Sequence, residues 1–410
     1  MRRFVMLSIA AVVLLALLVT MSETFAWVEV AAYNALPQLV DVAANEKYIA
    51  TLSVNIDACK CYVQVLNFTD LSLIANLTFT NCTSYGAVQV DVYDDIVVFA
   101  PIYSDCAGYN NTARIIIYNV SSGSIVDLLI PSISDPTMYT YTVYVAVTKD
   151  FVAAVVEDTA LDNYILHIFA LNGTELYYKD LVSGMVAPVR GMDNAIAYLT
   201  SDVTDNITIA TINPDGTLNE LFVFNVSVYP DGIAAEYIPE LNKIYIAYSG
   251  YLDAIDLDSG TRTSLASISA NVPRDLGISP LGNIVVCSVD KGVERYVVSE
   301  GRVVTEYLPV SAAYAYIAGS EKVVLADIMN NVVYIYENVE SGAVTTTQTA
   351  TVTEAVTETV TEALPVPVEE TVTETVTTTV TQPVIGTEAF IAILFILLIA
   401  AVVMLYSRSR

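Results

Sequence analysis

Short apolar segments separated by small polar turns fill the chain between residues 27 and 342. The segments are rich in Val, Ile, Tyr and Ala, and Gly, Asn, Asp and Ser divide them. β-branched and aromatic residues favour strands, whereas Gly, Asn and Asp favour the turns between strands. No long helical periodicity interrupts this pattern, so it predicts an all-β fold for the region.

A strand, a tight polar turn and a second strand recur as one unit at intervals of 41 to 53 residues. The central turn residues are Asp70, Gly123, Gly173, Gly216, Gly260, Gly301 and Gly342. A second family of apolar strands precedes the turns by about 20 residues, beginning at Tyr48, Ile96, Val152, Ile196, Ile244, Ile284 and Val323. A period in the forties with about four strands per unit is typical of β-propellers. The spacing therefore predicts a seven-bladed β-propeller over residues 27–342.

The seventh unit stops at Gly342, before its outermost strand, whereas the segment from Trp27 to Tyr33 precedes the first unit and has strand character. We expect this segment to supply the missing strand and to close the ring. Closure would remove the exposed edges of an open array of strands.

Turns such as Asp256-Leu-Asp-Ser-Gly resemble those of the YVTN and quinoprotein-like repeat propellers, and the resemblance extends over most of this region. Quinoprotein dehydrogenases repeat a Trp at their blade junctions, whereas this chain has one Trp in total. The chain also lacks a WD dipeptide, a kelch Gly-Gly pair and a sialidase-type Asp box. The resemblance therefore implies a fold and no cofactor.

Both ends of the chain carry targeting signals. Arg2 and Arg3 precede an apolar stretch that ends near Val19, and Thr24 and Ala26 suit signal-peptidase cleavage, which predicts a signal peptide over residues 1–26. An uncleaved signal anchor is the alternative. Residues 389–406 contain no charge and are long enough to cross a bilayer, and Arg residues follow them. We expect a transmembrane helix over residues 388–406, a cytoplasmic tail over residues 407–410, and type I topology.

Residues 343–387 form a low-complexity segment in which Thr supplies 17 positions and Val 10, with repeats of Thr-Val-Thr-Glu. A coiled coil is one alternative, but β-branched residues are poor helix formers. Strand alternation is another, but large apolar residues are few. We expect an extended, O-glycosylated stalk. Stalk and anchor together resemble cell-surface proteins of hyperthermophilic crenarchaea, which implies a place in the cell envelope lattice.

The net charge of −28 makes nucleic acid and anionic lipid poor partners for the ectodomain, so no nucleic acid partner is expected. Asn-x-Ser/Thr sequons predict a glycoprotein. They lie at Asn67, Asn76, Asn81, Asn110, Asn119, Asn172, Asn206 and Asn225. The last three repeat units carry no sequon and are the candidate docking surface.

Cys59, Cys61, Cys82 and Cys106 lie in the first two units, on loops that meet at one face of a propeller. An oxidising compartment favours two disulfides over a metal site, and each of Cys59 and Cys61 is expected to pair with Cys82 or Cys106. Cys287 lies within a strand and is expected to be a buried thiol.

His167, the only histidine, lies inside an apolar strand and is interpreted as a core residue. Two acidic clusters, Asp253/Asp256/Asp258 and Asp91/Asp94/Asp95, could suggest calcium. Acids are common in turns because they bond nearby backbone groups, so no metal site is assigned.

Two functions compete on this evidence. A non-catalytic surface module would bind envelope proteins, surface proteins or glycans, and the long stalk and the sequons favour it. An extracellular enzyme or solute-binding protein using the propeller channel is the alternative, and it requires convergent acids or a metal at the channel mouth. No catalytic residue is assigned, and fold alone does not decide between them.

Overall fold

The computed structural model describes residues 26–339, apart from positions 37, 84–88, 105–110, 134, 136–137, 182–183, 202–203, 280–281, 289–290, 307–312 and 318–321, together with residues 345–349 and 377–381. The chain divides into a compact unit of residues 31–337 and a second unit of residues 1–30 and 338–410. The expected signal peptide, transmembrane helix and cytoplasmic tail lie outside the described residues. No helix among the described residues is long and apolar enough to span a membrane.

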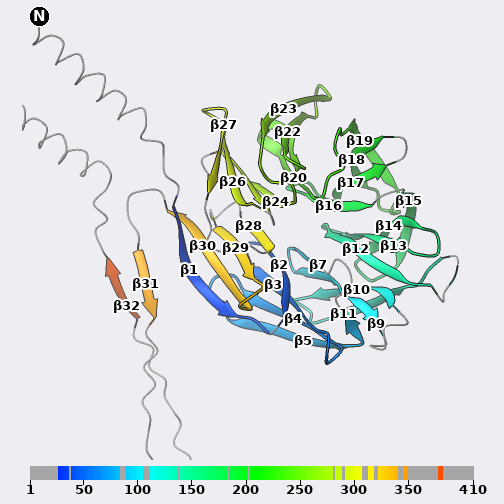
Figure 1. Ribbon diagram of the computed structural model, residues 1–410, viewed down its shortest axis with the longest axis horizontal. Coiled ribbons are helices and arrows are strands. Elements are labelled where there is room, and N and C mark those ends of the chain that lie inside the picture. The colour runs from blue at the N-terminus through cyan, green and yellow to red at the C-terminus, as the bar shows by residue number, and fades with distance from the viewer. Residues whose placement is uncertain are drawn as a thin grey trace, which may run out of the picture. The chain divides into compact units, whose positions relative to one another are not determined.

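Antiparallel meanders of four strands make up the 31–337 unit, and Figure 1 shows their first strands around a common centre. The first meander consists of β2 (Leu39–Ala44), β3 (Tyr48–Asn55), β4 (Lys60–Asn67) and β5 (Leu73–Thr80). The second consists of β7 (Gln89–Tyr93), β8 (Ile96–Ala100), β10 (Asn111–Asn119) and β11 (Ile125–Ile130), with the short strands β6 (Cys82–Thr83) and β9 (Ile102–Ser104) added. The third consists of β12 (Thr140–Val147), β13 (Phe151–Asp158), β14 (Asn163–Ala170) and β15 (Glu175–Leu181).

The chain continues around the ring in the same way. Next come β16 (Met185–Arg190), β17 (Ala195–Ser201), β18 (Asp205–Ile212) and β19 (Leu218–Asn225), then β20 (Ile233–Ile238), a 3-10 turn (Pro239–Leu241), β21 (Lys243–Tyr248), β22 (Tyr251–Asp256) and β23 (Thr261–Ser267). The last groups are β24 (Pro273–Ile278), β25 (Ile284–Ser288), β26 (Gly292–Val297) and β27 (Arg302–Glu306), then β28 (Ala313–Ile317), β29 (Lys322–Asp327), β30 (Val332–Val339) and β1 (Ala26–Asn34). The fold is an all-β propeller, as the sequence pattern predicts.

The grouping of the strands differs from the seven separate blades expected. Among the described residues of the ring, hydrogen bonds connect the strands into six sheets, because β16 and β20 pair in parallel and join two meanders into one eight-stranded sheet. The pairing covers only Val189↔Ala235 and Arg190↔Glu236. Gly191 permits this close approach, since a Cβ atom there would lie 2.5 Å from the carbonyl oxygen of Tyr237.

The middle strands are buried on both faces and the outer strands on one. β3 and β13 are buried along nearly their whole length, whereas side chains of β5 alternate between exposed and half-buried positions. One apolar cluster combines Leu52 and Val63 of the first meander with Val90 and Phe99 of the second. The continuous apolar segments in the sequence therefore follow from packing between neighbouring sheets.

The N-terminal strand closes the ring, as expected from the sequence. β1 adds to β30 as the fourth strand of the sheet β1-β30-β29-β28. The amide of Ala35 donates to the carbonyl of Asn331 at 2.9 Å, and the amide of Leu39 donates to the Asn331 side chain at 2.9 Å. This contact joins the two ends of the propeller sequence.

Two short strands lie within the segment expected to be a stalk. β31 (Thr345–Thr349) and β32 (Thr377–Thr381) pair antiparallel, with Thr345 opposite Thr381. The remainder of residues 343–387 lies outside the described residues, so an extended stalk stays a prediction.

Candidate functional site

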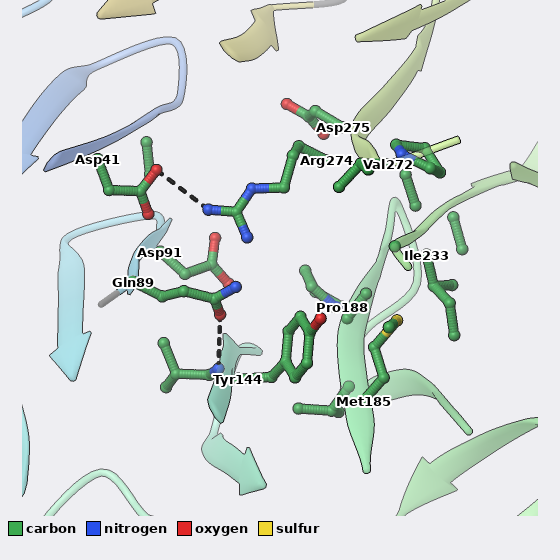
Figure 2. Close-up of a pocket in the computed structure, with 18 of the residues that line it drawn as sticks. Asp41, Gln89, Asp91, Tyr144, Met185, Pro188, Ile233, Val272, Arg274 and Asp275 are labelled. Carbon is green, nitrogen blue, oxygen red and sulfur yellow. Dashed lines mark hydrogen bonds and ion pairs between the residues drawn. The ribbon is translucent and has the colours of Figure 1, made fainter. Parts of the chain in front are cut away.

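The first strands of the meanders surround a cavity of about 190 Å³ at the centre of the ring. Asp41, Gln89 and Met185 lie near the beginnings of β2, β7 and β16, so the cavity lies toward the loops that connect each outer strand to the next inner strand. Figure 2 shows Tyr144, Met185 and Pro188 on one side of the cavity and the charged residues on the other. The site thus combines an apolar wall with a polar wall.

Side chains of one inner strand bond the backbone of the next. A carboxylate oxygen of Asp41 accepts from the Val90 amide at 2.9 Å. Gln89 and Asp91, both on β7, accept from the amides of Val145 and Val147 on β12 at 2.9 and 2.8 Å. These amides face the channel, where an unpaired N–H group would be costly. These polar side chains therefore stabilise the ring by connecting neighbouring inner strands.

Two arginines complete the polar wall. Arg274 on β24 lies 3.2 Å from Asp41 on β2, and Figure 2 shows the Arg274 side chain extended toward Asp41. The Arg190 guanidinium lies 2.8 Å from Asp275 and 3.6 Å from Asp91. The three carboxylates are at least 94% buried, so their pairing offsets much of the cost of removing charge from water.

The buried charges change the proton affinities of their neighbours. Burial raises the pKa of Asp91 to about 6, although Arg190 and two backbone amides act in the opposite direction. Burial and the nearby Asp275 raise the pKa of Glu236 to about 8. Glu236 is therefore largely protonated at neutral pH, although Arg190, which lies opposite it in the β16–β20 pairing, acts in the other direction.

A second cavity, of about 660 Å³, lies at the other ends of the inner strands, and Pro188 and Arg190 line both cavities. Exposed ion pairs surround it. Lys149 lies 2.6 Å from Asp193, which also accepts from the Tyr93 hydroxyl at 3.2 Å, while Lys47 pairs with Asp94. Exposed pairs of this kind contribute little stability.

Comparisons with known proteins support the propeller fold and do not identify a family or a function. No protein family matches the sequence, and no curated protein matches it. Among solved structures, a chain in the crystal structure of a mitotic checkpoint complex is similar, with a TM-score of 0.53 and 12% identity, covering 77% of this chain and 94% of that one. The Pan2 WD40 domain of Neurospora crassa is similar with a TM-score of 0.51 and 10% identity, covering 77% of this chain and 96% of that one. Such low identities show a β-propeller fold alone.

The cysteines expected to cluster are only partly described. Cys59 is disulfide-bonded, whereas Cys61 and Cys82 are buried thiols, so the structure differs from the expectation that Cys61 pairs with Cys82 or Cys106. Cys106 lies outside the described residues. Cys287 is a buried thiol on β25, as expected.

His167 is 3% exposed on β14 and stacks on Phe169, so it is the core residue that the sequence indicates. Its Nδ1 lies 2.6 Å from Glu175. Neither acidic cluster gathers as a metal site among the described residues. Asp253 instead pairs with Arg262 at 2.7 Å, and Asp256 accepts from the Ser259 amide at 2.9 Å.

The sequons lie at both faces and at the rim. Asn67, Asn119 and Asn172 lie beside turns between third and outer strands, and each side-chain oxygen accepts a backbone amide. Asn76 lies on the outer strand β5, whereas Asn81, Asn206 and Asn225 lie near the opposite ends of their strands. Asn110 lies outside the described residues.

Sequence reasoning missed the channel residues. Asp41 interrupts an otherwise apolar first strand, in Leu39-Val-Asp-Val, and Asp91 lies between two valines of another first strand, in Gln89-Val-Asp-Val. An acidic residue inside an otherwise buried strand needs a charged or hydrogen-bonding partner. This pattern could have predicted that Asp41 and Asp91 pair with residues of other inner strands.

The raised pKa of Glu236 makes stability depend on pH. The folded chain keeps a proton on Glu236 that the unfolded chain loses above its ordinary pKa near 4, so stability is full at low pH and falls as pH rises toward about 8. In urea unfolding, we expect Glu236→Gln to exceed the wild type in stability by roughly 2–4 kcal/mol at pH 9, and by much less at pH 5. Glu240→Gln, at an exposed acid nearby, is the control. An equal pH dependence in wild type and Glu236→Gln would contradict this account.

Proposed function

We propose that the chain is a non-catalytic interaction module of the cell surface, whose propeller binds a protein or glycan of the envelope through one face. The face in question carries the loops that enter the inner strands and the loops between second and third strands. We call it the loop face. The proposal rests mainly on the distribution of exposed apolar side chains between the two faces.

Eight large apolar side chains are exposed on the loop face. They are Ile56, Ile133, Met138, Leu161, Val228, Tyr229, Ile328 and Met329. On the opposite turns, only Leu241 and Val298 are comparably exposed among the described residues. Exposed apolar side chains that gather on one face mark interaction sites, and aromatic residues and Met are enriched in interfaces.

The channel itself supports binding less well than the face. The cavity on the side of the loop face, of about 190 Å³, is smaller than the ~300 Å³ at which small-molecule sites usually begin. The carboxylates of this cavity already bond strand amides and arginines. The second cavity, of about 660 Å³, exceeds that size, but it lies toward the face opposite the loop face, where exposed ion pairs surround it. The sequon-free meanders contribute Ile328 and Met329 to the loop face, so glycans would leave this part accessible.

We count the ring as seven blades, with β16–β19 and β20–β23 as separate blades. Each of these meanders is antiparallel throughout, and the pairing between them covers only two positions on each strand. An experimental structure in which β16 and β20 pair along their whole lengths would overturn the count.

The proposal includes secretion by residues 1–26, N-glycosylation at the sequons and anchoring by residues 388–406, which rest on the sequence alone. N-terminal sequencing should begin at Trp27. Extraction of membranes at alkaline pH should leave the full chain in the pellet and release a chain truncated after residue 387. Release of both forms would contradict the anchor.

A photo-crosslinking residue at position 329 should capture a partner from the envelope, whereas the same residue at position 298 should not. Met329 and Val298 are both exposed apolar residues, at 88% and 50%, on opposite faces, so each is the matched control for the other. In the full chain, Met329→Asp should weaken retention of the captured protein about tenfold, and Val298→Asp should not. Equal crosslinking from both positions, or crosslinking from position 298 alone, would refute a docking role for the loop face.

A further inference from the structure

Two buried thiols and a buried arginine meet at the junction of the first two meanders. Cys61 on β4 and Cys82 on β6 are fully buried in one apolar cluster, where each thiol shifts the pKa of the other. Arg114 on β10, only 7% exposed, donates from Nη1 to Cys82 Sγ at 3.3 Å. Three strands from two meanders thus contribute to one site.

Arg114 is fixed in place by several other contacts. Its Nε and Nη2 bond the two carboxylate oxygens of Asp127 at 2.8 and 2.6 Å. Nη1 also donates to the carbonyl of Thr80 at 2.9 Å, and the guanidinium lies over the rings of Phe79 and Tyr103. Asp127 occupies Nε and Nη2 of the guanidinium. Nη1 points away from Asp127 and can donate to the Cys82 sulfur.

Among the described residues, the other two cysteines do not compete for these sulfur atoms. Cys59 is disulfide-bonded, and its carbonyl accepts the Cys82 amide at 3.3 Å, which places the Cys82 backbone beside the turn before β4. Cys287 lies on β25, in a different sheet. Among the described cysteines, Cys61 and Cys82 are therefore the two thiols that share one cluster.

We propose that Cys61 and Cys82 become joined by a disulfide bond when the chain folds with a disulfide oxidant, and that Arg114 holds Cys82 as the attacking thiolate. The bond would link β4 to β6 and fix the junction between the first two meanders. It is a property of the chain itself and does not depend on the partner proposed above.

The reaction is a thiol–disulfide exchange in two steps. The Cys82 thiolate attacks one sulfur of oxidised glutathione, whose S–S bond breaks and releases one glutathione thiolate, which takes up a proton. Cys61 then loses its proton and attacks the Cys82 sulfur of the mixed disulfide, releasing the second glutathione. The two protein thiols are oxidised, and one glutathione disulfide is reduced to two thiols.

The assignment of roles follows from the surroundings of the two sulfurs. The hydrogen bond from Cys61 and the charge of Arg114 lower the pKa of Cys82, whereas burial raises the pKa of Cys61. The thiolate is the nucleophile in exchange, so Cys82 attacks first and Cys61 completes the bond. Both sulfurs are buried in the folded chain, so the oxidant must reach them in a late folding intermediate, in which Arg114 already contacts Cys82 but β6 is not yet fully packed.

The test is refolding of the reduced full chain with oxidised and reduced glutathione, followed by alkylation, digestion without reduction and mass spectrometry. We expect a linked peptide pair containing Cys61 and Cys82, and alkylated Cys287. The linked chain should melt about 5 °C above Cys61→Ser/Cys82→Ser, because the bond closes a loop of residues 61–82. Alkylation of both Cys61 and Cys82, or a link from either one to Cys59 or Cys106, would overturn the proposal.

The role of Arg114 is tested by the rate of the same reaction. Arg114→Gln should slow formation of the bond several-fold at pH 7 and shift its pH profile upward, since the thiolate loses its cationic neighbour. Arg302→Gln, which removes an exposed arginine paired with Glu300, is the matched control. An unchanged pH profile in Arg114→Gln would remove Arg114 from the account, and the linked peptide in the wild type would still decide the bond itself.

Discussion

Backbone amides that face the central channel impose the main constraint on this propeller. An inner strand pairs with the second strand of its own meander along one edge, and its other edge meets the channel, except at the two positions where β16 and β20 pair. Amides there need acceptors, and side chains of the neighbouring inner strand supply them, as Asp41 does for Val90 and Asp91 does for Val147. The sheets are thereby held to one another at the axis as well as through their apolar faces.

Burying the carboxylates that accept from these amides costs desolvation free energy, and ion pairs with two arginines offset part of that cost. Arg190 lies between Asp91 and Asp275, and Arg274 pairs with Asp41, so the ion pairs connect inner strands that are not neighbours in sequence. The raised pKa of Glu236 shows where the compensation is incomplete. A ring held in this way presents its loops on a framework of strands, and binding residues are often carried on loops that a scaffold positions.

The local part of the fold could be predicted from the sequence. Turn glycines such as Gly173 and Gly216 have φ angles of +85° and +86°, and a Cβ atom at Gly216 would lie 2.4 Å from Leu176 on the outer strand β15. The backbone conformation at these glycines is set by their own hairpin and by the adjacent one. The glycines therefore recur at a regular spacing that can be recognised in the sequence. The closing strand β1 was predictable for a similar reason, because a missing strand at one end matched a spare strand at the other.

The long-range part could not be predicted in the same way. The parallel contact of β16 with β20, the ion pairs across the channel and the meeting of Cys61 with Cys82 depend on how the sheets twist and pack. Asp91 illustrates the difficulty, since its sequence neighbours Asp94 and Asp95 suggested a cation site. In the fold, Asp91 points toward Arg190 and β12, whereas Asp94 and Asp95 pair with Lys47 at the surface.

Native-state hydrogen exchange of the channel amides tests the central claim most directly, namely that side-chain acceptors hold the inner strands together. In the wild type, the amides of Val145 and Val147 should exchange as slowly as those of the buried strand β13. In Asp91→Ala, Val147 should lose protection, while Val145, whose acceptor is Gln89, should keep it. Fast exchange of both amides in the wild type, or unchanged protection of Val147 in the variant, would contradict the account.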